Sequence, residues 1–88
     1  MIKEEAFEVK VEFVGFAAGF VAERIWSPDQ QIQKLPDGKI HLSFSASSEP
    51  ELVAWLLSFG DEVRLLEPDW LVDKVKRQVA QMEKNYEF

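Results

Sequence analysis

The feature that most constrains the fold of this chain is a strict alternation of apolar and charged residues over residues 7–13. The segment FEVKVEF places its apolar side chains on one face and its charged side chains on the other. This period of two is typical of a strand that is buried on one face only. The segment therefore predicts a sheet with one buried face and one polar face.

A second period follows, and it predicts a helix and then a hairpin. Apolar residues spaced four apart predict a short helix from about Phe16 to Arg24, which Gly19 weakens because glycine is unfavourable in a helix interior. The run QQIQKL predicts an edge strand, and residues 39–47 predict a second alternating strand. The turn Pro36-Asp37-Gly38 joins them, since proline presets φ and glycine accepts a positive φ.

The rest of the chain predicts a helix, a strand and a last helix. Ser48 and Glu51 match a capping box, and Gly60 matches a left-handed helix end. A strand is expected over residues 62–67, and a helix from Pro68 and Asp69 to about Tyr86. The order is that of the α+β, ferredoxin-like βαββαβ two-layer sandwich, with a four-stranded antiparallel sheet plus a C-terminal helix. Helices on one side leave the other sheet face open, and its expected residues are polar: Glu8, Lys10, Glu12, His41, Ser43 and Ser45.

Length and charge limit the possible roles. The 88 residues suffice for one domain with a single core, so residues 1–88 are taken as one domain. Acidic residues outnumber basic ones by 16 to 10, which argues against direct binding of duplex DNA, because such binding depends on lysine and arginine. Cysteine is absent, no apolar run suits a membrane helix, and we expect a soluble, cytoplasmic protein that does not contact membranes.

The last predicted helix carries a narrow apolar stripe. Leu71, Val75, Val79, Met82 and Tyr86 recur at spacings of three or four residues, flanked by charged and amide side chains. Such a stripe either packs on the domain's own sheet or pairs with a helix of another subunit. The candidate interface residues are Trp70, Leu71, Val75, Val79 and Met82.

Residues able to perform catalysis are sparse, and we expect no enzyme, cofactor or metal site. The single histidine, His41, has no second histidine or cysteine to complete a metal site. Neither a phosphate-binding loop nor a nucleophile with its base is apparent. Arg24 and Trp26 could receive a phosphate and a nucleobase, although packing of Trp26 at the edge of the core is the simpler interpretation.

Four motifs in one order resemble a known family. They are W-x-P-x-Q at Trp26 to Gln30, LPDG at Leu35 to Gly38, WLLSFG at Trp55 to Gly60, and V-x-L-x-x-P at Val63 to Pro68. Together they resemble the C-terminal extension domain of WYL-domain transcriptional regulators, bacterial proteins of the DeoR or YafY type.

This resemblance implies a ferredoxin-like fold and a place in a larger chain. In that family, a winged helix-turn-helix domain binds operator DNA, a WYL domain senses a ligand, and the terminal domain helps to form the dimer. The leading hypothesis is therefore a non-catalytic regulatory and dimerisation module in a homo-oligomer. The alternative is an effector-binding module that takes a nucleotide or short single-stranded nucleic acid with Arg24, Trp26, His41 and Arg64.

Overall fold

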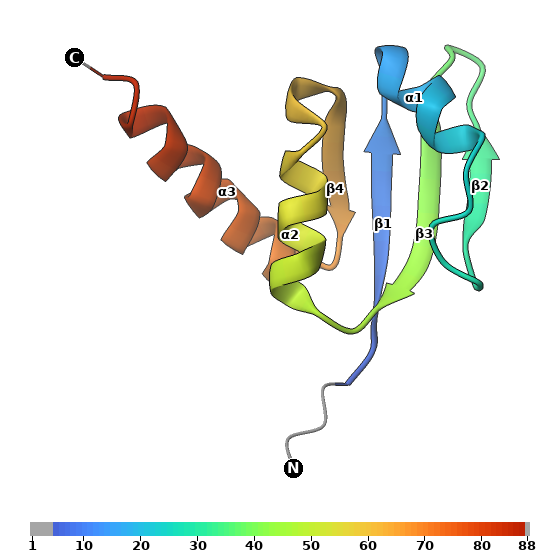
Figure 1. Cartoon of the computed structure of the whole chain (residues 1–88), viewed down its shortest axis with the longest axis horizontal. Helices are drawn as coiled ribbons and strands as arrows, with labels where there is room; N and C mark the ends of the chain where they lie inside the picture. Colours follow the sequence, from blue (N-terminus) through green and yellow to red (C-terminus); the bar gives the residue numbers. More distant parts are fainter. Residues whose placement is uncertain (1–4, 88) are drawn as a thin grey trace.

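The computed structural model describes residues 5–87 as an antiparallel sheet covered on one face by two helices (Figure 1). In chain order the elements are β1 (Phe7–Phe13), α1 (Gly15–Ala22), β2 (Gln31–Lys34), β3 (Ile40–Ala46), α2 (Glu49–Leu57), a 3₁₀ turn (Gly60–Glu62), β4 (Val63–Glu67) and α3 (Asp69–Lys84). The four strands lie in the order β2-β3-β1-β4. This confirms the predicted ferredoxin-like sandwich with an added C-terminal helix.

The core lies between the sheet and the helices α1 and α2. The alternation in β1 buries Val9, Val11 and Phe13, and the matching strand β3 buries Ile40 and Leu42. Phe44 and Ala46, which alternate with the polar residues of β3, are partly buried against this core. The helices supply the opposite layer through Ala17, Ala18, Val21, Leu52 and Leu56.

Helix α1 ends two residues earlier than predicted, because groups of the loop after it take over its last hydrogen bonds, and strand β2 is limited to Gln31–Lys34. After Ala22, the carbonyl of Val21 accepts from the amide of Arg24 at 3.2 Å and from the Trp26 indole Nε1 at 3.1 Å. These bonds replace a further helical turn. The helix therefore ends before Arg24.

The N-terminus of α1 is capped from a distant part of the chain. The carboxylate of Glu62, which closes the 3₁₀ turn before β4, accepts hydrogen bonds from the amides of Phe16 at 3.2 Å and Ala17 at 3.0 Å. Gly15 has φ +61°, and a β-carbon there would collide with the Glu62 carboxylate. Glycine at this position therefore permits a cap that no neighbouring side chain provides.

Helix α3 leaves the rest of the domain soon after it begins (Figure 1). We call residues 5–67, from the start of the described chain to the end of β4, the body. Leu71 is fully buried against the body, and Val72 and Val75 are partly buried against its core. The helix ends at Lys84 rather than Tyr86, where short-range bonds such as Tyr86 N to Glu83 O at 3.0 Å tighten the last turn.

Candidate interaction surfaces

The first turns of α3 are attached to the body by three different contacts. The Trp70 ring meets Phe7 edge-on with ring centroids 5.3 Å apart. Leu71 is buried, and the Lys74 ammonium lies 2.8 Å from the Glu49 carboxylate at the start of α2. These contacts hold the base of α3 against β1 and α2.

Past these contacts, α3 exposes its apolar stripe. We use the name α3 stripe for Val75, Val79, Met82 and Tyr86. The exposed fraction is 47% at Val79, 41% at Met82 and 77% at Tyr86. Scattered apolar residues are common on protein surfaces, but a row of them on one helix face is typical of an interaction site. Of the predicted interface residues, Leu71 is an internal packing residue, whereas Val79 and Met82 are available to a partner.

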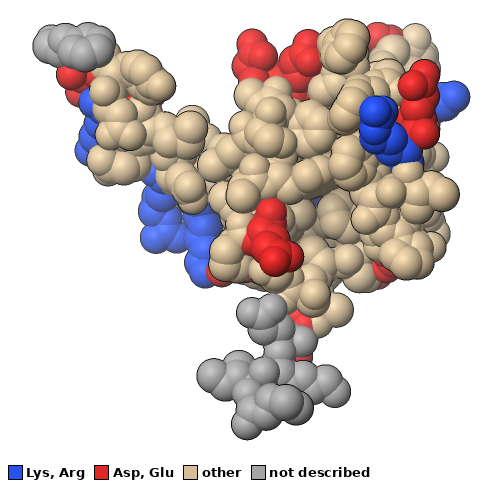
Figure 2. Space-filling view, viewed as in Figure 1, with Lys and Arg blue, Asp and Glu red and all other residues tan. Residues whose placement is uncertain are grey.

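An apolar groove runs between α3 and the edge of the body. Its volume is about 600 Å³, and it is lined largely by the aliphatic side chains of Leu57, Leu66, Val72, Val75, Val79 and Ala80. Arg64, Lys76 and Glu83 also line it. Figure 2 shows that Lys and Arg side chains gather on one side of α3, while the side towards the body is largely free of charge. The α3 stripe and this groove form one continuous apolar surface.

The open face of the sheet is polar, and it places two of the proposed effector-binding residues on either side of Glu12. Glu12 on β1 pairs in register with His41 on β3 and with Arg64 on β4. The His41 Nε2 atom lies 3.0 Å from the Glu12 carboxylate, and each side chain is 17% exposed. The hydrogen bond from His41 lowers the pKa of Glu12, with further lowering by the positive charges of Lys39 and Arg64.

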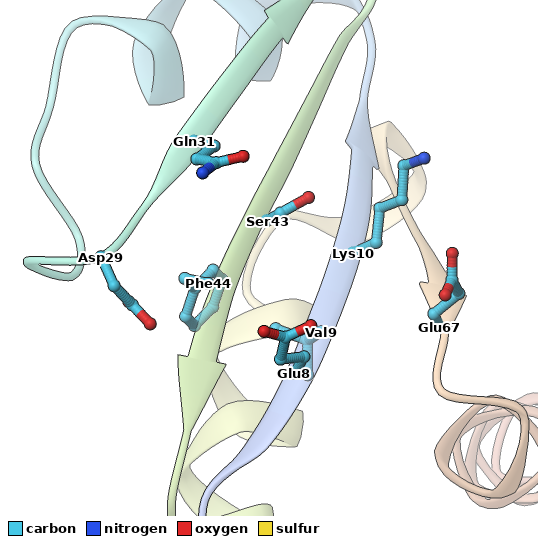
Figure 3. A pocket seen from close by; sticks show the side chains of 8 residues that line it. All are labelled: Glu8, Val9, Lys10, Asp29, Gln31, Ser43, Phe44 and Glu67. Carbon is cyan, nitrogen blue, oxygen red and sulfur yellow. The ribbon is translucent and has the colours of Figure 1, made fainter.

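A second row on the open face lines a shallow hollow of about 290 Å³ (Figure 3). Gln31, Ser43, Lys10 and Glu67 stand on the four strands in register. Glu8 and Asp29 also line the hollow, so its charges are three carboxylates and one ammonium. An acidic hollow of this kind repels phosphate groups.

The other two proposed effector-binding residues lie elsewhere. The Arg24 guanidinium is 3.7 Å above the Phe20 ring of α1. Trp26 is partly buried among aromatic rings of the helical layer, 5.3 Å from Trp55 between ring centroids. Arg24 and Trp26 thus belong to the helical layer, and His41 and Arg64 to the open sheet face. The structure does not assemble these four residues into one site.

Two residues that the sequence interpretation passed over hold the loop between α1 and β2. Gln30 donates its amide to the Arg24 carbonyl at 3.0 Å, and its carbonyl oxygen accepts from the amides of Trp26 and Ser27. Asp29 accepts from the Ser27 hydroxyl at 2.6 Å and from the Ser45 amide of β3, and these bonds lower its pKa. The W-x-P-x-Q motif was the sequence pattern that could have indicated this loop, and its residues stabilise the loop conformation.

Two further kinds of feature are absent from the described residues, a metal-binding cluster and a membrane-spanning helix. Within residues 5–87, no group of three or more His, Cys, Asp or Glu residues is arranged to hold a metal ion. No helix of this same stretch is both long and apolar enough to cross a membrane.

Comparisons with known proteins agree with the motifs. The sequence model of the WCX domain matches residues 5–82. Protein PafC from two strains of Mycobacterium tuberculosis, CDC 1551 / Oshkosh and ATCC 25618 / H37Rv, is 35% identical over 49 residues. That alignment covers 56% of this chain but only 16% of each relative, so the chain corresponds to a small part of their length.

Proposed function

The chain belongs to the WCX domain family, and on this premise we propose that it is the regulatory and dimerisation domain of a WYL-type bacterial transcriptional regulator. Family membership supports a role in transcriptional regulation in general, and a non-enzymatic one. In the proposal, residues 1–88 form the C-terminal module of a DeoR-type chain that also carries winged helix-turn-helix and WYL domains. Such a regulator acts on DNA in the cytoplasm.

The single observation that carries the proposal is the uncovered apolar surface of α3. Val79 and Met82 are 47% and 41% exposed, and the adjoining groove is lined mostly by aliphatic side chains. Burial of apolar area is the main favourable contribution to the association of protein surfaces. Contact with another protein surface is therefore the best-supported role for this helix.

Regulation through this surface requires two arrangements of the regulator that differ in stability. An effector bound at the WYL domain changes the equilibrium only if it binds one arrangement more tightly than the other. The proposed part of this domain is to hold two subunits, or two domains of one subunit, in a defined relative position. The change in that position then reaches the DNA-binding domains.

The alternative, a nucleotide or single-stranded nucleic acid effector bound by this domain, has weaker support. His41 is already hydrogen-bonded to Glu12, and Trp26 is packed among other rings. The hollow on the open face is lined by three carboxylates and one lysine. No feature of the described surface favours a phosphate there, and titration of the chain with short oligonucleotides would test this alternative.

Sedimentation velocity of this chain over a wide concentration range tests the proposed function. We expect self-association, or binding to the remaining domains of the same regulator supplied separately, and we expect Met82→Glu to abolish it. Gln81→Glu is the matched control, because Gln81 is exposed and lies outside the α3 stripe. A chain that neither self-associates nor binds those domains would remove the support for this function.

A further inference from the structure

The spacing along α3 is compatible with one particular partner, a second copy of the same helix. In a heptad, Val72 and Val79 occupy one core position, and Val75 and Met82 occupy the other, while Tyr86 continues the spacing in the turn just after the helix. An antiparallel pair places the two kinds of core position opposite each other. Val79 then faces Met82 of the second copy, and Val75 faces its Tyr86. Because the relation is reciprocal, every contact occurs twice around a two-fold axis.

The charges beside the stripe select the same arrangement. Lys76 and Glu83 are seven residues apart, so they occupy the same flanking position of the heptad, next to the groove. In the antiparallel register given above, Lys76 faces Glu83 of the second copy, and Glu83 faces its Lys76. A parallel pair would instead bring Glu83 beside the neutral Gln78. Charged residues at such flanking positions set the orientation of helix pairs.

We infer that α3 pairs with α3 of a second copy in antiparallel orientation, around a two-fold axis between Val79 and Met82. This inference rests on the proposed function and specifies its partner. Leu71 of the two copies would be about 28 Å apart along the pair, since a helix rises about 1.5 Å per residue. The two bodies therefore lie at opposite ends of the pair.

The groove completes this contact. In the antiparallel pair the C-terminal turn of one helix runs back towards the body of the other copy. Tyr86, which is 77% exposed, reaches the level of Val75 of the second copy, where the groove is lined by Leu66 and Val72. A tyrosine ring can cover these aliphatic side chains while its hydroxyl stays in water.

Reversing the charge at Lys76 or at Glu83, or exchanging the two charges, tests whether the two α3 helices are antiparallel. Sedimentation velocity is measured for the wild type, for Lys76→Glu, for Glu83→Lys and for the double variant. Each single variant creates two like-charge contacts per dimer and should weaken dimerisation about tenfold. The double variant should restore wild-type association, and an equal mixture of the two single variants should associate more tightly than either alone. Arg77→Glu, on the outer side of the helix, is the control and should have little effect.

Disulfide trapping gives an independent readout, because the chain contains no cysteine. An oxidised mixture of Val79→Cys and Met82→Cys chains should yield mainly the mixed disulfide. A majority of Val79→Cys homodimers would indicate a parallel pair and overturn the inference.

The remaining outcomes separate the orientation from the function. If Met82→Glu abolishes dimerisation and the charge reversals have no effect, the proposed function stands and the antiparallel register is wrong. If the chain stays monomeric but binds the other domains of the regulator through Met82, the second copy is excluded and the regulatory contact remains. If neither kind of binding occurs, both proposals fail.

Discussion

Helices α2 and α3 are both amphipathic, but their apolar residues have different surroundings. In α2, Leu52 and Leu56 are buried, and Trp55 lies within 6 Å of the rings of Phe13, Trp26, Phe44 and Phe59 between centroids. In α3, only Leu71 is buried, and within residues 5–87 the stripe beyond Val75 stays largely exposed. Similar side chains therefore stabilise the fold in α2 and are available for association in α3.

The aromatic cluster explains why three tryptophans occur in so small a domain without forming a stacking site. Helices α1 and α2 are short, at 8 and 9 residues, and aromatic rings fill the space between them. Phe59 lies 5.0 Å from Phe13 and 5.2 Å from Trp55 in edge-on geometry. Edge-on pairs of this kind add about 0.5–1.5 kcal/mol each beyond simple burial.

The largest effect on folding is expected at Phe13. This ring is fully buried and contacts both Trp55 and Phe59, so Phe13→Ala should lower the free energy of unfolding by about 3–5 kcal/mol. Denaturant unfolding followed by tryptophan fluorescence measures this change. Phe16→Ala is the matched control, because Phe16 is 81% exposed, and it should change the free energy by no more than about 0.5 kcal/mol. Equal effects at the two positions would show that the cluster is not the stabilising region.

At Val79 a substitution is expected to weaken dimerisation and to leave the stability of the monomer almost unchanged. Val79→Glu should leave the free energy of unfolding of the monomer within about 0.5 kcal/mol, because the side chain is 47% exposed. It should raise the dissociation constant of the dimer more than about tenfold, since each of the two half-exposed valines loses about 0.8 kcal/mol of burial and a charge enters the contact. Comparing unfolding at low protein concentration with sedimentation velocity separates the two quantities. A large loss of monomer stability would mean that α3 packs on its own body beyond Val75.

A smaller effect is expected where Glu62 caps α1. Glu62→Ala leaves the amides of Phe16 and Ala17 without their acceptor, and the free energy of unfolding should fall by about 1 kcal/mol. Faster hydrogen exchange of those two amides is the specific measurement. Asp61→Ala, at the exposed neighbouring residue, should not change their exchange. Unaltered exchange in Glu62→Ala would contradict the capping contact.

The smallest expected effect is on the pH dependence of stability, and it comes from Glu12 on the open sheet face. Folding lowers the pKa of Glu12, mainly through the hydrogen bond from His41. The ionised carboxylate therefore stabilises the folded state above the unfolded pKa of about 4.3, and this contribution disappears as the pH falls through the lower folded value. In Glu12→Gln, stability should fall less steeply between about pH 5 and about pH 3, by a difference under about 1 kcal/mol.

Removal of His41 provides the control for that titration. His41→Ala should remove most of the same pH dependence, and combining it with Glu12→Gln should add little, since the two residues act through one contact. Parallel pH curves for the wild type and Glu12→Gln would show that the contact does not form in solution.

The sequence predicted the sheet better than the surfaces around it. The alternation in β1 and β3 is a local property, and it was enough to identify buried residues such as Val9, Val11 and Leu42. The course of α3 could not be predicted in this way. Its apolar stripe has the same period whether the helix folds back on the sheet or extends away from it.

Contacts between distant residues were also beyond local reasoning. Glu62 caps α1 across a separation of 46 residues, and no pattern near Phe16 indicates an acceptor. Trp26 was correctly regarded first as a packing residue, but its neighbours Trp55 and Phe59 come from another helix and the loop after it. Such pairs become visible only when the topology brings α1 and α2 onto one face.

The edge-on contact between Phe7 and Trp70 lies at one end of α3, so a small rotation of the helix about this contact would move its other end much further. The ring of Phe7 stands at the start of β1, and the ring of Trp70 stands in the first turn of α3, with centroids 5.3 Å apart. The helix extends about 21 Å from this point, so a rotation of about 10° there would carry its far end through about 4 Å. A displacement at the start of β1 too small to disturb the sheet would thus be amplified at the tip of α3.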